Sequence, residues 1–452
     1  MRFGATISGA ILFSLMIVWE MTAAESQANF YKDVLPILQK NCQNCHRPGQ
    51  IAPMSFLTYS SVRPWAKAMK AAVVTRKMPP WFADPQYGHF SNDRSLKQSD
   101  IETIVKWADA GAPEGKPEDA PAPVQWPGNN WQIQPDVIVD IPPFNVPASG
   151  LVEWTNITIP NPFKEDTWVT AILVRPDNVA VTHHIGVLFK PHTAESRYYV
   201  PRWTDKNRDE SGSERPRFRP SQPQQQLALL PTGMAIEASY VPGMQFPDYS
   251  LFEAGKLIPA DVDLDIQVHY TPNGKEVVDH PQVGFVLAKR EPKYRYISYA
   301  ISAPNDADSF AIPPNTGNWE SPPAEATFEE DAELVWFSPH MHVRGKDMTY
   351  RLEYPDGRKE IILNVPRYDF NWQLGYELAA PIKVPKGTRF VATAHFDNSA
   401  NNKFNPDPNR TVYYGNQTWE EMMQPFFGIV VNKKVDPQKL LKRRGPIPSG
   451  AE

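Results

Sequence analysis

The apolar positions near the N-terminus recur at the spacing of α-helices. Within residues 28–39, an apolar face is formed by Phe30, Val34, Ile37 and Leu38. The segment Ser99-Asp100-Ile101-Glu102 has the form of a capping box and predicts the start of a second helix, which Gly111 and Pro113 end. The apolar face of this second helix comprises Ile101, Ile104, Val105 and Ala108. Together the two helices predict a small all-α domain over residues 27–115.

From about residue 136 the pattern changes to the alternation that is typical of β-strands. Apolar residues alternate with polar ones at Met348, Tyr350, Leu352 and Tyr354, and the turn sequence Pro355-Asp356-Gly357 follows. Short strands are also predicted within residues 150–159, 168–174 and 389–396. An all-β architecture of one or two sandwiches suits this length. The polar stretch 202–225 is predicted to be a long surface loop.

Composition marks the segments that separate and flank these domains. Proline accounts for 47 of the 452 residues, about twice its ordinary usage. A proline-rich stretch over residues 116–135 predicts an extended, semi-rigid linker. The basic tail, residues 436–452, could dock an acidic redox partner, although a solvated tail is the simpler interpretation.

The first 24 residues resemble a secretory signal. Arg2 precedes an apolar run over residues 7–19, and the small residues Thr22-Ala23-Ala24 follow it. A retained membrane anchor is the alternative, but the run is short for a bilayer and Glu20 ends it. We therefore expect an exported, periplasmic or secreted protein without a membrane span in the mature chain.

Charge and cysteine content exclude two classes of protein. The formal net charge is −5, which argues against a nucleic-acid partner held by phosphate contacts. Both cysteines of the chain lie in one motif, Cys42-Gln43-Asn44-Cys45-His46, which excludes a disulfide scaffold.

That motif is the attachment sequence of a c-type haem, with two thioether bonds and His46 as an axial iron ligand. The alternative is a redox dithiol beside an incidental histidine. We predict Met78 as the sixth iron ligand, because the prolines of Lys77-Met78-Pro79-Pro80-Trp81 stiffen its loop. The other candidates are Met54, Met69 and His89. The expected domain is therefore a cytochrome c-like one with a single covalent haem.

Five further histidines occur in strand-like surroundings. Residues i and i+2 of a strand share a face, so His340 and His342 can bind one ion. Adjacent His183 and His184 should point to opposite faces, and to share a metal they need a bulge or ligation through different ring nitrogens. Each single histidine, including His269, also admits a purely structural role.

Three blocks of sequence carry a resemblance to a known family. They are Thr182-His183-His184-Ile185-Gly186-Val187, Gln267-Val268-His269-Tyr270 and Pro339-His340-Met341-His342. Together with Gly415-Asn416-Gln417-Thr418-Trp419-Glu420-Glu421-Met422, they resemble the copper type II, ascorbate-dependent monooxygenases in order and approximate separation. This family includes the peptidylglycine α-hydroxylating and dopamine β-monooxygenases.

The resemblance implies two jelly-roll-like sandwich domains, over residues 136–300 and 301–435, each holding one mononuclear copper. His183, His184 and His269 would form the electron-transfer site. His340, His342 and Met422 would form the oxygen-activating site, where a thioether favours Cu(I). Met423 is the rival ligand, with core packing as its other role.

The chain departs from the peptide-amidating members at two positions. Ser338 stands where they carry an arginine that clamps the substrate carboxylate, and Phe426 stands where they carry a tyrosine. A peptidyl-glycine substrate is therefore not supported, because a carboxylate needs a charged or hydrogen-bonding partner.

The sequence as a whole predicts a monooxygenase that hydroxylates an aliphatic C–H bond of a small organic molecule with dioxygen. Electrons would come from a redox donor protein or a small reductant, and would pass from the haem to the first copper and then to the second. The alternatives are a reductase or oxidase of a small inorganic molecule, and a non-catalytic copper-binding electron carrier.

Overall fold

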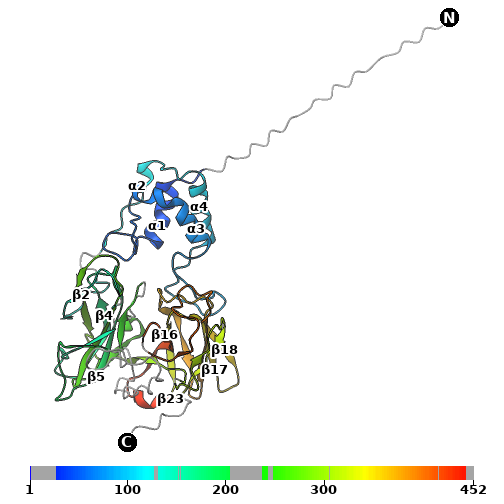
Figure 1. The fold of residues 1–452 in the computed structure, drawn as a ribbon. Coiled ribbons are helices and arrows are strands. Elements are labelled where there is room, and N and C mark those ends of the chain that lie inside the picture. The colour runs from blue at the N-terminus through cyan, green and yellow to red at the C-terminus, as the bar shows by residue number, and fades with distance from the viewer. Residues whose placement is uncertain are drawn as a thin grey trace.

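In the computed structural model, helices α1 to α4 gather at one end of the molecule and the β-strands occupy the rest (Figure 1). The structure describes residues 1, 27–126, 131–150, 152, 154–203, 237–242, 248–304, 306–415 and 417–443. The predicted signal with its cleavage near Ala24, most of the predicted loop over residues 202–225, and residues 444–452 of the tail lie outside the described residues. The expectation of a mostly β chain is confirmed.

The N-terminal helices pack around one apolar core. Their bounds are η1 Phe30–Val34, α1 Leu35–Asn41, α2 Tyr59–Val62, η2 Arg63–Trp65, α3 Ala66–Val74 and α4 Gln98–Asp109. Residues of η1, α1 and α4 are fully buried together, among them Phe30, Leu38, Ile104 and Trp107. The predicted apolar face of the first helix is confirmed, although its first turn is a π-helix. None of the described helices has the length and apolarity needed to cross a membrane.

The predicted capping box at Ser99 is wrong. Helix α4 begins two residues earlier than that box predicts, at Gln98, with Lys97 as its N-cap and without a side-chain capping bond. The backbone carbonyl of Lys97 accepts hydrogen bonds from the amides of Asp100 and Ile101, so the first turn closes on the backbone instead. The predicted end of the helix is confirmed by Gly111, whose φ of +84° continues the chain away from the helix axis.

Most of the β-strands belong to three sheets. The largest described sheet has the order β1 (Val137–Asp140), β11 (Gln282–Leu287), β4 (Thr167–Arg175), β8 (Ala254–Ile258), β12 (Tyr294–Ala300), β22 (Met423–Asn432), β16 (Ala332–Met341) and β19 (Tyr376–Val384). A second sheet has the order β18 (Lys359–Val365), β17 (Gly345–Glu353), β20 (Arg389–Phe396), β15 (Ala324–Phe328) and β23 (Leu441–Arg443), with β14 (Trp319–Glu320) beside β20. The third has the order β6 (Pro201–Trp203), β3 (Thr155–Ile159), β9 (Val262–Tyr270), β5 (Thr182–Pro191) and β7 (Ala238–Tyr240). Two short pairs complete the described strands, namely β2 (Phe144–Val146) with β10 (Val277–Asp279) and β13 (Ala311–Ile312) with β21 (Val412–Tyr413).

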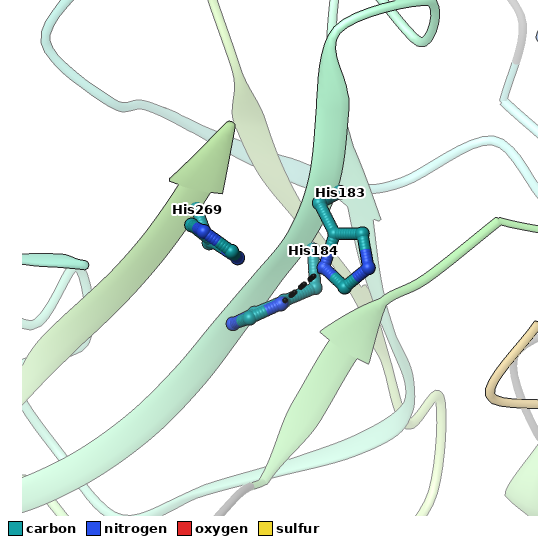
Figure 2. A group of neighbouring side chains, drawn as sticks. All are labelled: His183, His184 and His269. Carbon is teal, nitrogen blue, oxygen red and sulfur yellow. Dashed lines mark hydrogen bonds between the residues drawn. The ribbon is translucent and has the colours of Figure 1, made fainter. Parts of the chain in front are cut away.

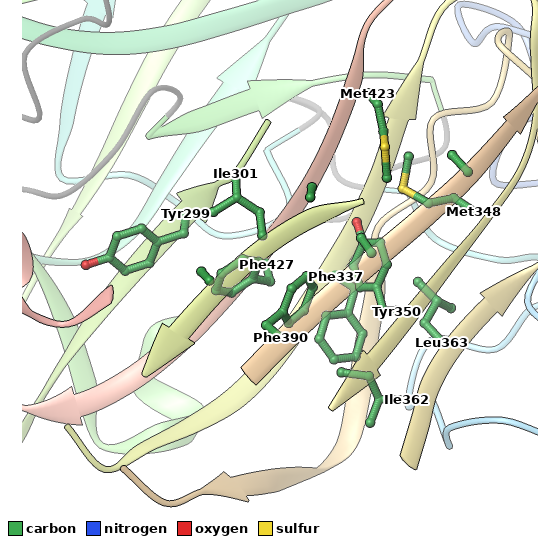
Figure 3. Packing of buried hydrophobic residues seen from close by; sticks show 14 of the residues in the cluster. Tyr299, Ile301, Phe337, Met348, Tyr350, Ile362, Leu363, Phe390, Met423 and Phe427 are labelled. Carbon is green, nitrogen blue, oxygen red and sulfur yellow. The ribbon is translucent and has the colours of Figure 1, made fainter. Parts of the chain in front are cut away.

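Two apolar cores lie between these sheets. The first joins side chains of β3, β5 and β9 to those of β4 and β11. The second joins β17 and β20 to β12, β16 and β22, and Figure 3 shows Phe337, Tyr350, Phe390 and Phe427 packed within it. The alternation predicted for residues 348–354 is confirmed, since its four apolar side chains are all buried in the second core.

The largest sheet runs through both β halves. Strand β12 pairs antiparallel with β22, and at Tyr294 and Arg295 it also pairs in parallel with Ala254 and Gly255 of β8. Because β8 belongs to the first half and β22 to the second, the two halves share a continuous sheet. The shared sheet therefore holds the two β halves in one arrangement relative to each other.

Residues 81–92 join the helical end to the second β half. The amide of Ser91 donates to the carbonyl of Glu377 at 2.8 Å, and the amide of Ala379 donates to the carbonyl of His89 at 2.8 Å. The ring of Trp81 contacts that of Tyr376 edge to face, with centroids 4.9 Å apart. This segment, which follows Met78 directly, therefore packs along β19.

Candidate metal centre

A β-bulge brings the first histidine group together. In the pairing of β5 with β9, Thr182 lies opposite Tyr270 and His184 lies opposite His269, so His183 is the extra residue. Of the two arrangements predicted to let His183 and His184 share a metal, the structure has the bulge. Since Ile185 and Val268 point into the first core, His184 and His269 project from the outer face of the same sheet.

The three side chains converge as metal ligands do. The ligand atoms of His183, His184 and His269 lie within 4.8 Å of one another, and the Nδ1 atoms of His183 and His184 are 3.1 Å apart (Figure 2). The Nδ1 atom of His269 is buried and, within the described part of the chain, has no hydrogen-bond partner. A buried imidazole nitrogen without a partner is costly unless it binds a ligand, so this group suits a metal ion.

Burial keeps these imidazoles in the form that binds metals. It lowers the pKa of His183 to about 4 and that of His269 to about 3, and neighbouring histidines lower both further. Burial likewise lowers the pKa of His184 well below its ordinary value. All three are therefore neutral at pH 7 and need not release a proton to coordinate a cation.

The second histidine pair lies at the end of β16. Phe337 and Met341 point into the second core, so the alternation turns His340 to the opposite, outer face. The ring of His340 donates from Nδ1 to Oε1 of Gln373 at 2.6 Å, and the ring of His342 donates from Nδ1 to the carbonyl of Glu420 at 3.1 Å. Both bonds leave Nε2 as the free ligand atom.

The Nε2 atom of His342 is buried and has no partner among the described residues. Burial lowers the pKa of His340 to about 4 and that of His342 well below its ordinary value. The carboxylate of Glu421 accepts from the backbone amides of His342 and Arg344, at 2.9 and 2.6 Å. The segment that precedes Met422 thus holds His342 in place.

The strand register separates the two rival methionines. His340 lies opposite Gln424 and Met341 lies opposite Met423, so Met423 shares the core-facing side of Met341. The sulfur of Met423 accepts a hydrogen bond from the hydroxyl of Ser321 at 3.0 Å, and its side chain is fully buried. Met422 directly precedes β22, is 4% exposed and belongs to the same apolar core as Met423. Its role as a ligand beside His340 and His342 stays a prediction.

Aromatic side chains lie between the two histidine groups, and the sequence analysis missed them. The ring centroid of Trp154 is 4.4 Å from that of His184, 5.5 Å from that of His269 and 6.4 Å from that of His342. The ring of Phe370 stacks on His183 at 4.8 Å and lies 6.2 Å from His342. The outer faces of the two β halves therefore meet at the five histidines.

The Cys42–His46 motif directly follows helix α1. The ring of His46 stacks on Phe56 with centroids 4.1 Å apart, and its Nδ1 donates to the carbonyl of Met54 at 3.3 Å. This bond leaves Nε2 available for iron. Cys42 and Cys45 are free thiols, and burial followed by the Cys45 charge raises the pKa of Cys42 to about 12. A redox dithiol needs a lowered pKa, so this environment argues against the dithiol alternative.

The candidate sixth ligands occupy different places. Met69 is buried in the helical core. The backbone carbonyl of Met54 accepts the hydrogen bond from Nδ1 of His46, on the side of the ring opposite Nε2. His89 is exposed, with its carbonyl bound to Ala379 on β19. Met78 is half-buried at the start of the loop that packs on β19, and its role as sixth ligand stays a prediction.

Comparison with known proteins adds no relative. No protein-family model matches the chain, and no curated protein matches it.

Proposed function

We propose that the chain is an exported, haem- and copper-dependent monooxygenase that hydroxylates an aliphatic C–H bond. It would be related to the copper type II, ascorbate-dependent monooxygenases, with a cytochrome c-like domain followed by two jelly-roll-like domains. The observation that carries the proposal is the convergence of five imidazoles, three of them buried, from β5, β9 and the end of β16. Imidazole with thioether is a donor set for copper, and zinc does not ordinarily recruit methionine.

Each cofactor has its own residues in this proposal. Cys42, Cys45, His46 and Met78 would hold the haem, and His183, His184 and His269 would hold the first copper. His340, His342 and Met422 would hold the second copper. When bound, these groups supply one-electron transfers and the reduction of dioxygen, with one oxygen atom entering the product and one leaving as water.

The chain's own residues orient these ligands and limit the access of water. Gln373 and the carbonyl of Glu420 fix the ring orientation of His340 and His342. His342 is fully buried, and His184 and His269 are each less than a tenth exposed. A site enclosed in this way restricts side reactions at the metal.

Tyr240 lies on the strand next to the first histidine group. Strand β7 places Tyr240 opposite Ile185, the residue that follows His184. Burial, and then the neighbouring Cys45 thiol, raise the pKa of Tyr240 above its ordinary value. The charge of the Cys45 thiolate would thus act on Tyr240, which lies on the strand paired with β5.

The surroundings of His340 favour a substrate that is not anchored by a carboxylate. Ser338 lies opposite Phe426 in the strand pairing, and the Phe426 ring is 6.1 Å from that of His340. A hydroxyl and an apolar ring cannot neutralise a carboxylate as an arginine does.

Labelled dioxygen tests the proposed reaction. Reduced holoprotein would be given ¹⁸O₂ with a panel of small aliphatic substrates, and the products analysed by mass spectrometry. We expect one labelled oxygen atom in an organic product, and none in the product of the His342→Ala variant. Label that appears only in water or peroxide would instead support an oxidase of a small inorganic molecule.

A further inference from the structure

Trp154 occupies a special place between the two histidine groups. It contacts two members of the first group, His184 and His269, and also His342 of the second. Its indole ring meets His184 and His342 at 71° and 70°, so the edges and faces of all three rings are in contact. Trp154 is 6% exposed and His342 is fully buried, so solvent is largely excluded from this contact.

Only one other described aromatic ring contacts both groups. Phe370 stacks on His183 with an interplanar angle of 26° and meets His342 at 88°. It contacts one histidine of the first group, whereas Trp154 contacts two. The centroid distance from Trp154 to His184, 4.4 Å, is also the shortest between either ring and any of the five histidines.

We propose that Trp154 is the side chain through which an electron passes between the two histidine groups. This inference rests on the proposed function, because it requires copper at both groups. With copper bound at both groups, one electron would pass. The ion held by His183, His184 and His269 would be oxidised from Cu(I) to Cu(II), and the ion held by His340, His342 and Met422 would be reduced from Cu(II) to Cu(I).

The indole ring of Trp154 supplies packed atoms between His184 and His269 on one side and His342 on the other. Electron transfer slows steeply when packed atoms between donor and acceptor are replaced by empty space. A leucine at position 154 retains bulk but removes the contact with His342, so the rate between the groups should fall. A phenylalanine at the same position keeps an aromatic ring and should restore most of the rate.

Anaerobic reduction of the oxidised holoprotein separates this step from the others. Haem reduction is followed by absorbance, and the cupric ions are followed by freeze-quenched electron paramagnetic resonance. In the wild type, two phases of cupric signal loss are expected, one for each histidine group. Trp154→Leu should slow the second phase at least tenfold and leave the first phase unchanged, with Trp154→Phe close to the wild type. Phe370→Leu is the matched control and should slow the second phase less than threefold.

Metal content distinguishes failure of this inference from failure of the proposed function. A wild type that binds fewer than two copper ions contradicts the proposed function itself. If the wild type binds two and Trp154→Leu keeps both phases at wild-type rates, only the role of Trp154 is overturned. Equal slowing of the second phase by Trp154→Leu and Phe370→Leu also overturns the role of Trp154. Loss of copper from Trp154→Leu does the same, because in both cases Trp154 would act through packing alone.

Discussion

At the scale of single residues, one bulged position decides whether the first histidine group forms. Without the extra residue His183, the two-residue period of β5 would turn neighbouring side chains to opposite faces. The adjacent histidines made this requirement predictable. Trp154 and Phe370 were not predictable, because single aromatic residues far from the histidines in sequence carry no spacing signal. Only the folded chain brings them to the histidine rings.

The two neighbouring methionines give a sharp test at this scale. Met422→Leu should lower the Cu(I) affinity of the second site roughly tenfold or more, since it would remove the thioether that the proposal assigns to that site. Met423→Leu is the matched control, because Met423 lies opposite Met341 and its sulfur is bonded by the Ser321 hydroxyl. A volume-conserving change at such a buried position costs less than about 1.5 kcal/mol. Competition with a Cu(I) chelator measures the Cu(I) affinity of both variants. A larger loss of affinity in Met423→Leu than in Met422→Leu would make Met423 the ligand instead.

The buried histidines predict the acid stability of the metal-free protein. Burial lowers the pKa of His183 and His340 to about 4, against about 6.5 in an unfolded chain. Between these values the unfolded chain binds protons that the folded chain does not, so the free energy of unfolding falls as pH decreases. Each such histidine contributes about 1.4 kcal/mol per pH unit.

Urea unfolding of the metal-free protein from pH 7 to pH 4 measures this slope. His340→Gln should make it shallower by one histidine's share. An unchanged slope would mean that His340 is protonated in the folded state, contrary to its burial.

At the scale of elements, regular alternation was the most dependable signal. The strand predicted over residues 389–396 coincides with β20, and the alternation at residues 348–354 lies largely within β17. The strand predicted from residue 150 begins at Thr155 instead. The start of α4 was misplaced because a backbone carbonyl took the role expected of the Ser99 side chain.

The contact of Trp81 with β19 can be tested as a unit. Trp81→Ala should cost about 2 kcal/mol of stability, since its half-buried ring packs against Tyr376 and Phe90. It should also speed hydrogen exchange at the amides of Ser91 and Ala379, which tie this segment to β19. Trp65→Ala is the control, because Trp65 is 41% exposed and its loss should change stability by less than about 0.5 kcal/mol. Unchanged exchange in Trp81→Ala would show that the segment does not depend on this ring.

At the scale of the whole molecule, the candidate site exists because two β halves share a sheet. The parallel pairing of β8 with β12 joins residues about forty positions apart, and β22 then adds a segment from near the end of the described chain. No local pattern specifies such a pairing. The sequence therefore indicated which histidines belong to each group, whereas the arrangement of the groups across shared aromatic rings required the fold.

The metal content of the purified holoprotein tests the central claim most directly. Elemental analysis combined with the optical spectrum of the haem should give two copper ions and one covalent haem per chain. His183→Ala and His342→Ala should each lose one copper ion and keep the haem, because their side chains belong to different groups. Fewer than two copper ions in the wild type, or loss of both from either single variant, would contradict two separate copper sites beside a haem.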